Sequence, residues 1–443
     1  MPAAHVTANG LRFPDGFLWG ASTAAHQIEG NNVNSDWWHM EHGGGSIAEP
    51  SGDAADSYHR WREDMDLLAE LGFTDYRFSI EWARIEPAPG HFSKAELAHY
   101  RRMVDGALER GLRPMVTLHH FTVPRWFAEC GGWTADGAVD LFERYVRATA
   151  PVIGAGVRHV CTINEPNMIA VAGAVRDLGT EAPPTAGLVL PDKATTDALI
   201  QAHHRATAAV KAISADIQAG WSVANQVYQA LPGAEAATAA YSHPREDVFI
   251  EAARDDDWVG VQSYTRTRVG TDGTVPAPDD AERTLTGWEY YPRAVGYALR
   301  HTAEIVGDVP LIVTENGIAT GDDSRRIAYT TGALQEVSAA LEDGLDVRGY
   351  LHWSALDNYE WGSYKPTFGL ISVDPDTFAR TPRPSAAWLG GLARTGVLPR
   401  AASWDSPQPR QAAQLLDPQE SCKEQEQQDH GGAARSEGQG GRP

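Results

Sequence analysis

Two glutamates stand at positions where a carboxylate could do chemistry. Glu165 and Glu315 each follow a short apolar segment, and each is followed by a turn-forming residue. Two carboxylates that face each other across a cleft can cleave a glycosidic bond, one as acid and the other as nucleophile or base. A single glutamate in such a setting is often a solvated loop residue, but a matched pair is harder to explain that way.

Further polar and aromatic side chains lie within or just after the other apolar segments. Amides and a histidine suit the hydroxyl groups of a sugar, and flat indoles suit the apolar faces of sugar rings. These candidates are Gln27, Arg77, His120, Asn164, Asn225, Gln262, Tyr264, Trp353, Glu360 and Trp361. We expect them to gather with the two glutamates on one rim of the fold.

The elements that would position these side chains alternate regularly along the chain. Eight apolar segments cover residues 17–21, 75–80, 113–119, 159–163, 219–224, 258–262, 311–314 and 347–353. Continuous apolarity of this kind is typical of strands that are buried on both faces. Segments of helical period lie between them, at 58–71, 94–110, 138–153, 196–213, 292–306 and 325–341. Only the fifth unit is obscure, because residues 226–243 mix loop signals with a weak helix.

Eight strand–helix units in this order predict the α/β class and a single (β/α)8 TIM barrel over residues 12–397. Catalytic groups of such a barrel lie at the carboxyl ends of its strands, where the candidates above stand. A doubly wound open sheet is the alternative, although it usually has fewer strands.

The two ends of the chain differ from this pattern. Residues 1–11 are interpreted as an N-terminal arm. Residues 398–443 are rich in Gln, Gly, Ala, Ser and Pro and have almost no apolar period. Such a segment cannot bury enough apolar surface to offset the entropy of ordering, so we predict a disordered tail.

Charge and cysteine content limit the partners and the compartment. The net charge is 37 − 59 = −22, which disfavours nucleic acid and anionic membrane surfaces and favours a neutral or cationic small molecule. Three cysteines (Cys130, Cys161 and Cys422) cannot form a disulfide framework. Neither a secretory signal nor an apolar stretch long enough for a bilayer is visible. We expect a cytoplasmic protein, with its oligomeric state left open and homo-oligomers included.

Other chemistries find less support. No Gly-rich phosphate-binding loop, dinucleotide motif or Gly-x-Ser-x-Gly nucleophile turn is present. His119 and His120 could be interpreted as metal ligands, but neighbouring residues of a strand point to opposite faces. We therefore expect one histidine to bind substrate and the other to pack outside, and we expect neither a metal nor an organic cofactor.

Several sequence motifs together resemble one known family. They are FPDGFLWGAS at 13–22, QIEG at 27–30, YRFSIEW at 76–82, TINEP at 162–166, VTENG at 313–317, HWSALDNYEW at 352–361 and FGL at 368–370. In this order and spacing, from about Leu11 to Gly396, they resemble the retaining β-glucosidases of glycoside hydrolase family 1.

The resemblance implies a role for each matching residue. Glu315 would attack the anomeric carbon, and Glu165 would act as acid and then as base. Arg77 and Tyr264 would hold the nucleophile ionised. The residues that would bind the non-reducing sugar are Gln27, His120, Asn164, Glu360 and Trp361, with Trp353 as part of the platform beneath it. The positive charge of Arg77 should lower the pKa of Glu315. The negative charge of Glu315 should raise the pKa of Glu165.

Three residues depart from the family pattern. Phe121 stands where the family usually has Trp, Gln262 where it has Asn, and Asn167 where a bulkier group is frequent. Gln262 is expected to hold Glu165 differently, and all three changes are expected to bear on preference for the leaving group, the aglycone. Phe368, within the FGL motif, is a further candidate at the edge of the site.

Several alternatives remain beside the leading hypothesis of a retaining β-glucosidase that removes terminal non-reducing β-D-glucosyl residues. The same chemistry could serve a β-galactosidase, a β-fucosidase or a transglycosidase. Family members acting on phosphorylated sugars generally lack an acid at the Glu360 position, and thioglucosidases replace the acid/base glutamate, which is Glu165 here. A non-catalytic sugar-binding barrel should have lost one carboxylate, and a metal-dependent hydrolase would need several inward His and Asp ligands.

Overall fold

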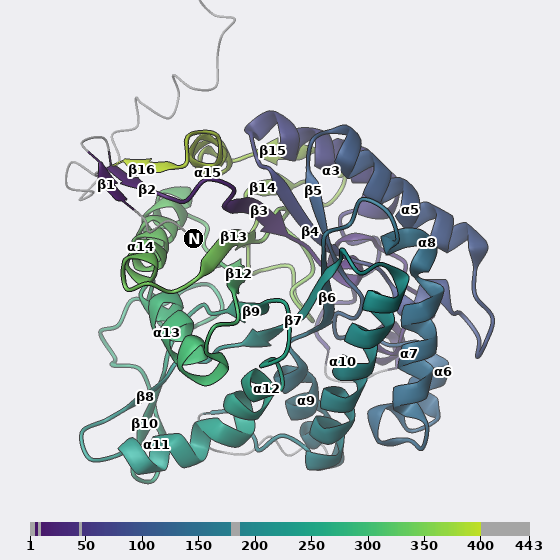
Figure 1. Ribbon diagram of the computed structural model, residues 1–443, viewed down its shortest axis with the longest axis horizontal. Coiled ribbons are helices and arrows are strands. Elements are labelled where there is room, and N and C mark those ends of the chain that lie inside the picture. The colour runs from purple at the N-terminus through teal and green to yellow at the C-terminus, as the bar shows by residue number, and fades with distance from the viewer. Residues whose placement is uncertain (1–4, 8–9, 44–46, 179–186, 400–443) are drawn as a thin grey trace, which may run out of the picture. The chain divides into compact units, whose positions relative to one another are not determined.

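A computed structural model describes residues 5–7, 10–43, 47–178 and 187–399 of the chain. Eight parallel strands close into a barrel in the order β12-β13-β3-β4-β5-β6-β7-β9, at the centre of Figure 1. They are β3 (Leu18–Ser22), β4 (Asp75–Ser79), β5 (Arg113–Thr117), β6 (His159–Asn164), β7 (Gln218–Ala224), β9 (Val259–Gln262), β12 (Leu311–Asn316) and β13 (Val347–Trp353). The prediction of a (β/α)8 barrel is confirmed.

Helices surround the barrel and bury the outer faces of its strands (Figure 1). They are α3 (Ser57–Leu71), α5 (Lys94–Glu109), α7 (Ala138–Ala148), α8 (Ala150–Ile153), α9 (Pro166–Leu178), α10 (Lys193–Ile213), α13 (Ala294–Val306), α14 (Asp323–Glu342) and α15 (Pro384–Thr395). The helix predicted over 138–153 is two helices, because Pro151 has no N–H to donate and disfavours helical backbone in the residue before it.

The obscure fifth unit contains more helix than its sequence indicates. After β8 (Tyr228–Ala230), the chain forms α11 (Glu235–Ser242), a π-helical segment (His243–Asp247) and α12 (Val248–Glu251). Pro244 lies in the π-helical segment, where its missing N–H removes one donor of a regular α-helix. The short elements of the loops are α1 (Ala25–Ile28), α2 (Asp36–His42), α4 (Trp82–Ile85), α6 (Arg125–Glu129), a 3-10 turn (Gly132–Thr134), β10 (Thr267–Gly270), β11 (Gly273–Val275), β14 (Ile371–Val373) and β15 (Arg380–Pro382).

Both predicted ends of the barrel domain need correction. Strand β2 (Gly10–Arg12) pairs with β16 (Val397–Pro399), and β1 (His5–Thr7) pairs with β2, in a small antiparallel sheet. Leu398 is buried against the core, so the paired residues belong to the folded unit and not to an arm or a tail. The remainder of the predicted disordered tail, residues 400–443, lies outside the described residues.

The interior of the barrel is packed with side chains. One apolar layer consists of Leu18, Met115, Cys161, Trp258, Ile312 and Leu351, all of them buried. A TIM barrel is filled in this way and has no pore, so polar groups are left to gather at its mouth. Within the described residues, no helix has the length and apolar character needed to cross a membrane.

Candidate active site

Glu315, near the end of β12, is held by two donors from other strands. Arg77 of β4 donates from Nη1 to Oε1 of Glu315 at 2.6 Å. Tyr264, two residues after β9, donates its hydroxyl to Oε2 at 2.6 Å. Each carboxylate oxygen therefore has its own strong donor, and the orientation of the carboxylate is set from both sides.

Burial and these two donors have opposite effects on the pKa of Glu315. Burial raises it, while the charge of Arg77 and the hydrogen bonds from Tyr264 and Arg77 lower it. The expected effect of the cation is present, but the net pKa lies above the usual value because burial outweighs it. The predicted lowering by Arg77 is therefore one contribution to a pKa that burial raises overall.

Glu165 stands directly after β6 in a left-handed backbone conformation, with φ of 46°. No described residue donates a hydrogen bond to its carboxylate. Burial, followed by the negative charge of Glu315, raises the pKa of Glu165 well above its ordinary value, as predicted. Since only Glu315 has direct donors, a proton shared by the two carboxyls belongs on Glu165.

Asn164, at the end of β6, contacts side chains from β4, from β9 and from the segment after β5. Its Oδ1 accepts hydrogen bonds from Arg77 Nη2 and from Gln262 Nε2, the latter at 2.9 Å. Its Nδ2 lies 3.3 Å from Nε2 of His120. The expectation that Gln262 would hold Glu165 is thus corrected, because its amide at the end of β9 reaches past β7 to Asn164 at the end of β6.

A second polar group lies on the loop after β13. Glu360 accepts from Nε1 of Trp353 at 3.1 Å, and burial raises its pKa to about 8. Gln27 donates from Nε2 to Oδ1 of Asn358 at 3.0 Å and to the carbonyl oxygen of Tyr359 at 2.9 Å. Asn358 was missed as a site residue, although it lies within the motif that ends at Trp361.

Three of these side chains keep a buried polar atom without a protein partner among the described residues. The atoms are Oε1 of Gln27, Nδ1 of His120 and Oε1 of Gln262. Leaving such a group unpaired costs about 1–3 kcal/mol, and these three atoms are available for hydrogen bonds with a ligand.

Aromatic rings form one wall of the site. The ring of His120 stacks with Trp353 and Trp361, at centroid distances of 6.0 and 6.2 Å. Phe121 meets Trp361 edge to face at 5.0 Å, and Trp361 also stacks on His26 at 5.7 Å. No sequence signal singled out His26, because its role arises only from packing between loops that are far apart in the chain.

The two adjacent histidines have different surroundings, as expected. While His120 faces the site, His119 packs against Trp133 and Phe142 at 5.4 and 5.9 Å. Within the described residues, one group of three metal-type ligands has its ligand atoms within 4.8 Å of one another, namely Glu246, Asp247 and His301. That group contains neither His119 nor His120.

A cavity of about 440 Å³ opens beside Tyr264, and Met168, Arg266 and Trp288 also line it. Phe368 packs on Tyr264 and Trp288, at centroid distances of 5.9 and 6.3 Å. No motif pointed to Trp288, which lies in a loop.

Two of the candidate residues, Asn225 and Asn167, have structural roles. Asn225, which lines this cavity, directs its Nδ2 to Glu246 at 3.1 Å. Asn167 is buried and bonds to the backbone of Ala224 and Arg245, so it cannot touch an aglycone directly.

Comparison with known proteins agrees with this geometry. The model of glycosyl hydrolase family 1 matches residues 10–252 and 251–396. Thermostable beta-glucosidase B of Thermobispora bispora is 32% identical, over 89% of this chain and 93% of the relative. The crystal structure of beta-glycosidase BGL167 is 44% identical, with a TM-score of 0.79, covering 90% of this chain and 99% of that one. Beta-glucosidase from Thermotoga maritima in complex with glucoimidazole is 28% identical, with a TM-score of 0.80, covering 87% and 100%. The chain belongs to glycosyl hydrolase family 1.

Proposed function

We propose that the protein is a retaining β-glucosidase, which removes terminal non-reducing β-D-glucosyl residues from small glycosides. One observation carries the proposal: Glu315 is held between Arg77 and Tyr264, whereas no described residue donates to Glu165, whose pKa is raised well above its ordinary value. This asymmetry assigns nucleophile and acid to different carboxyls. The names of the relatives support the substrate class.

The reaction proceeds in two displacements. Glu315 attacks the anomeric carbon and forms a covalent ester while the bond to the leaving oxygen breaks, and Glu165 gives its proton to that oxygen. The ester removes the negative charge of Glu315, so the pKa of Glu165 falls and its carboxylate becomes a base. Glu165 then takes a proton from water as the water oxygen attacks the same carbon, and Glu315 leaves as a carboxylate.

Hydrolysis of p-nitrophenyl glycosides tests the proposal. The panel contains the β-glucoside, β-galactoside, β-fucoside, α-glucoside and 6-phospho-β-glucoside, with a chelator present. Rapid release from the β-glucoside, with none from the α-anomer, is expected. Faster release from the β-galactoside or β-fucoside would instead favour the alternative glycone. No release from any of these substrates would contradict the proposal.

Tyr264→Phe is expected to move the acidic limb of the kcat/KM profile to higher pH. The hydroxyl stabilises the ionised form of Glu315, so its loss raises the pKa of that nucleophile further, and activity then disappears at a higher pH on acidification. A lost hydrogen bond to a charged group also predicts a fall in kcat/KM of about tenfold to a hundredfold.

A matched tyrosine controls for general damage. Tyr76 is buried next to Arg77 and bonds Thr23 Oγ1 at 2.9 Å, without touching Glu315. Tyr76→Phe should leave both limbs of the profile in place. An unmoved acidic limb in Tyr264→Phe would show that this hydroxyl does not support the nucleophile.

Glu360→Ser is expected to lower kcat/KM for the β-glucoside by about a hundredfold, because the carboxyl group can make two hydrogen bonds with sugar hydroxyls. The same change should raise the ratio of 6-phosphoglucoside to glucoside hydrolysis, since the carboxyl no longer occupies that end of the pocket. Glu360→Gln keeps the size and cannot ionise, so it separates the loss of hydrogen bonds from the loss of bulk. An unchanged substrate ratio in both variants would show that Glu360 takes no part in sugar recognition.

The proposal includes a cytoplasmic location. It is supported by the low cysteine content and by Cys130 and Cys161, which are free thiols. Labelling of the exposed Cys130 thiol in fractionated cells tests it, because recovery of the protein outside the cytoplasmic fraction would contradict the location.

A further inference from the structure

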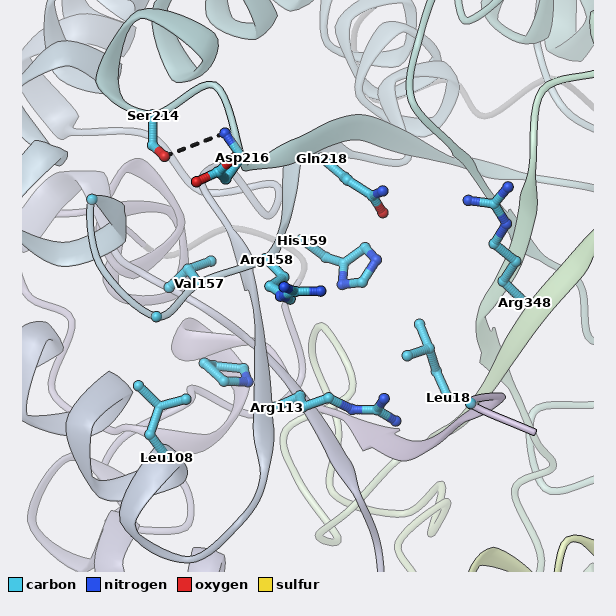
Figure 2. Close-up of a pocket in the computed structure, with 14 residues that line it drawn as sticks. Leu18, Leu108, Arg113, Val157, Arg158, His159, Ser214, Asp216, Gln218 and Arg348 are labelled. Carbon is cyan, nitrogen blue, oxygen red and sulfur yellow. Dashed lines mark hydrogen bonds between the residues drawn. The ribbon is translucent and has the colours of Figure 1, made fainter.

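The amino ends of the barrel strands enclose a second cavity, of about 850 Å³ (Figure 2). Its lining includes the first residues of four barrel strands: Leu18 of β3, Arg113 of β5, His159 of β6 and Gln218 of β7. The two catalytic glutamates lie at the carboxyl ends of β6 and β12, so this cavity is at the opposite end of the barrel.

The packed interior separates the two ends. The apolar layer that contains Met115, Cys161 and Ile312 fills the barrel, and Leu18 of the same layer also lines the cavity. A molecule bound at the amino end therefore does not reach Glu165 or Glu315. Whatever this cavity binds is independent of the proposed glycosidase reaction.

The cavity is rich in guanidinium groups. Arg113, Arg158 and Arg348 line it together with a single carboxylate, Asp216, and Figure 2 shows them around the hollow with His159. No described residue pairs with Arg158, which is exposed.

The other two arginines already have partners, but they keep free donors. Arg113 pairs through Nη2 with Asp75 at 2.6 Å, and Arg348 pairs through Nη2 with Asp346 at 2.7 Å. Neither aspartate lines the cavity, and the Nη1 group of each arginine has no hydrogen-bond partner in the described part of the chain.

The charges of all three arginines affect the pKa of the His159 imidazole. Burial, and then the charges of Arg113, Arg158 and Arg348, lower its pKa to about 4, while a hydrogen bond with Gln218 acts against them. All three cations therefore act on one point of the cavity. The neutral ring keeps one N–H to donate at neutral pH.

We propose that this cavity is a binding site for a small phosphate-bearing anion, held by Arg113, Arg158 and Arg348 with His159 as a neutral donor. Planar guanidinium forks match the several oxygens of a phosphoryl group and bind them through charge-assisted hydrogen bonds. The volume lies within the range of small-molecule sites, about 300–1,000 Å³, and leaves room for more than one phosphate. The net charge of −22 opposes acidic polymers, so the occupant is small.

Calorimetric titration of the full chain at low ionic strength tests the site. The probes are inorganic phosphate, inorganic pyrophosphate and ATP without divalent metal. Saturable binding of pyrophosphate or ATP, tighter than that of phosphate, identifies a polyphosphate or phosphate ester as the ligand; binding of phosphate alone identifies the free ion. Binding should also raise the melting temperature.

Substitutions locate the site. Arg158→Ser removes a side chain without a described partner, and it should weaken binding about tenfold while leaving the unliganded melting temperature unchanged. Arg348→Gln should weaken binding similarly. The matched control is Arg102→Ser on α5, an exposed arginine outside the cavity lining, which should bind as the wild type does. Equal affinity of Arg158→Ser, Arg348→Gln and Arg102→Ser would overturn the proposal.

A second readout does not depend on heats of binding. An anion that neutralises the guanidinium charges should raise the pKa of His159, which NMR of its ring C–H detects, with His159→Gln for assignment. A His159 titration that none of the three probes moves, together with no saturable heat, would exclude the site.

Discussion

Glu315→Gly is expected to lower hydrolysis of a β-glucoside by at least about 10⁴-fold, because no other group can form the covalent ester. The glycine also leaves a space where the carboxylate stood, between Arg77 and Tyr264. A glycosyl fluoride of α configuration resembles the missing intermediate, so the variant should transfer its sugar to an added acceptor with Glu165 as base. Thin-layer or mass-spectrometric detection of the transfer product measures this second activity.

The control is a buried carboxylate outside the barrel. Asp64 on α3 pairs with Arg380 at 2.7 Å, and neither residue contacts the site. Asp64→Asn should lower the melting temperature, since it breaks a buried pair, yet keep kcat/KM close to that of the wild type. If Glu315→Gly kept substantial hydrolysis, or if the α-fluoride gave no product with folded protein, Glu315 would not be the nucleophile.

Much of the fold could be predicted because the barrel strands are buried on both faces. All residues of β3 and β12, for example, are buried, so their apolar runs are continuous and easily recognised. The pairing of β2 with β16 was missed, since it joins two segments of about three residues that lie nearly the whole chain apart. Such short edge strands have no periodicity to detect.

The site was predictable as a set of residues but not as a set of contacts. Strand ends identify Glu165 and Glu315, because barrel topology alone places them on one rim. Which acceptor the Gln262 amide reaches depends on the registers of β6 with β7 and of β7 with β9, and here Nε2 donates to Oδ1 of Asn164. The pKa of Glu315 likewise depends on how far burial exceeds the effect of Arg77, and burial cannot be read from spacing.

The site also contains backbone conformations that no propensity predicts. Glu165, Phe121 and Trp361 all have positive φ, at 46°, 65° and 48°. Each such residue costs about 1–3 kcal/mol and persists only where its surroundings enforce it. Glycine is needed at position 317 for a different reason, because a Cβ there would lie 2.1 Å from the carbonyl oxygen of Trp353. The glycine of the VTENG motif is thus required by close packing of β12 against β13 and not by the chemistry.

Glu165→Ala is expected to separate substrates by their leaving groups. General acid catalysis contributes about 10²–10⁴-fold, so an alkyl or cellobiosyl-type glycoside should lose about 10³-fold in kcat/KM. A 2,4-dinitrophenyl glucoside needs little protonation to depart, so formation of its glycosyl-enzyme should be nearly unaffected. The alkaline limb of the pH profile, which follows loss of the Glu165 proton as pH rises, should vanish in the variant. Steady-state kinetics on both substrates across pH measures these effects.

Azide then tests the position of the missing side chain. The alanine leaves room beside the anomeric carbon, and azide is already an anion, so it can attack the glycosyl–Glu315 ester without a base. A bond from nitrogen to carbon forms, the ester bond breaks, and Glu315 leaves as a carboxylate with a β-glycosyl azide as product. Glu165→Gln retains the bulk of the side chain and should respond to azide far less. Equal losses on both leaving groups, or an α-glycosyl azide as product, would be incompatible with Glu165 as the acid/base opposite Glu315.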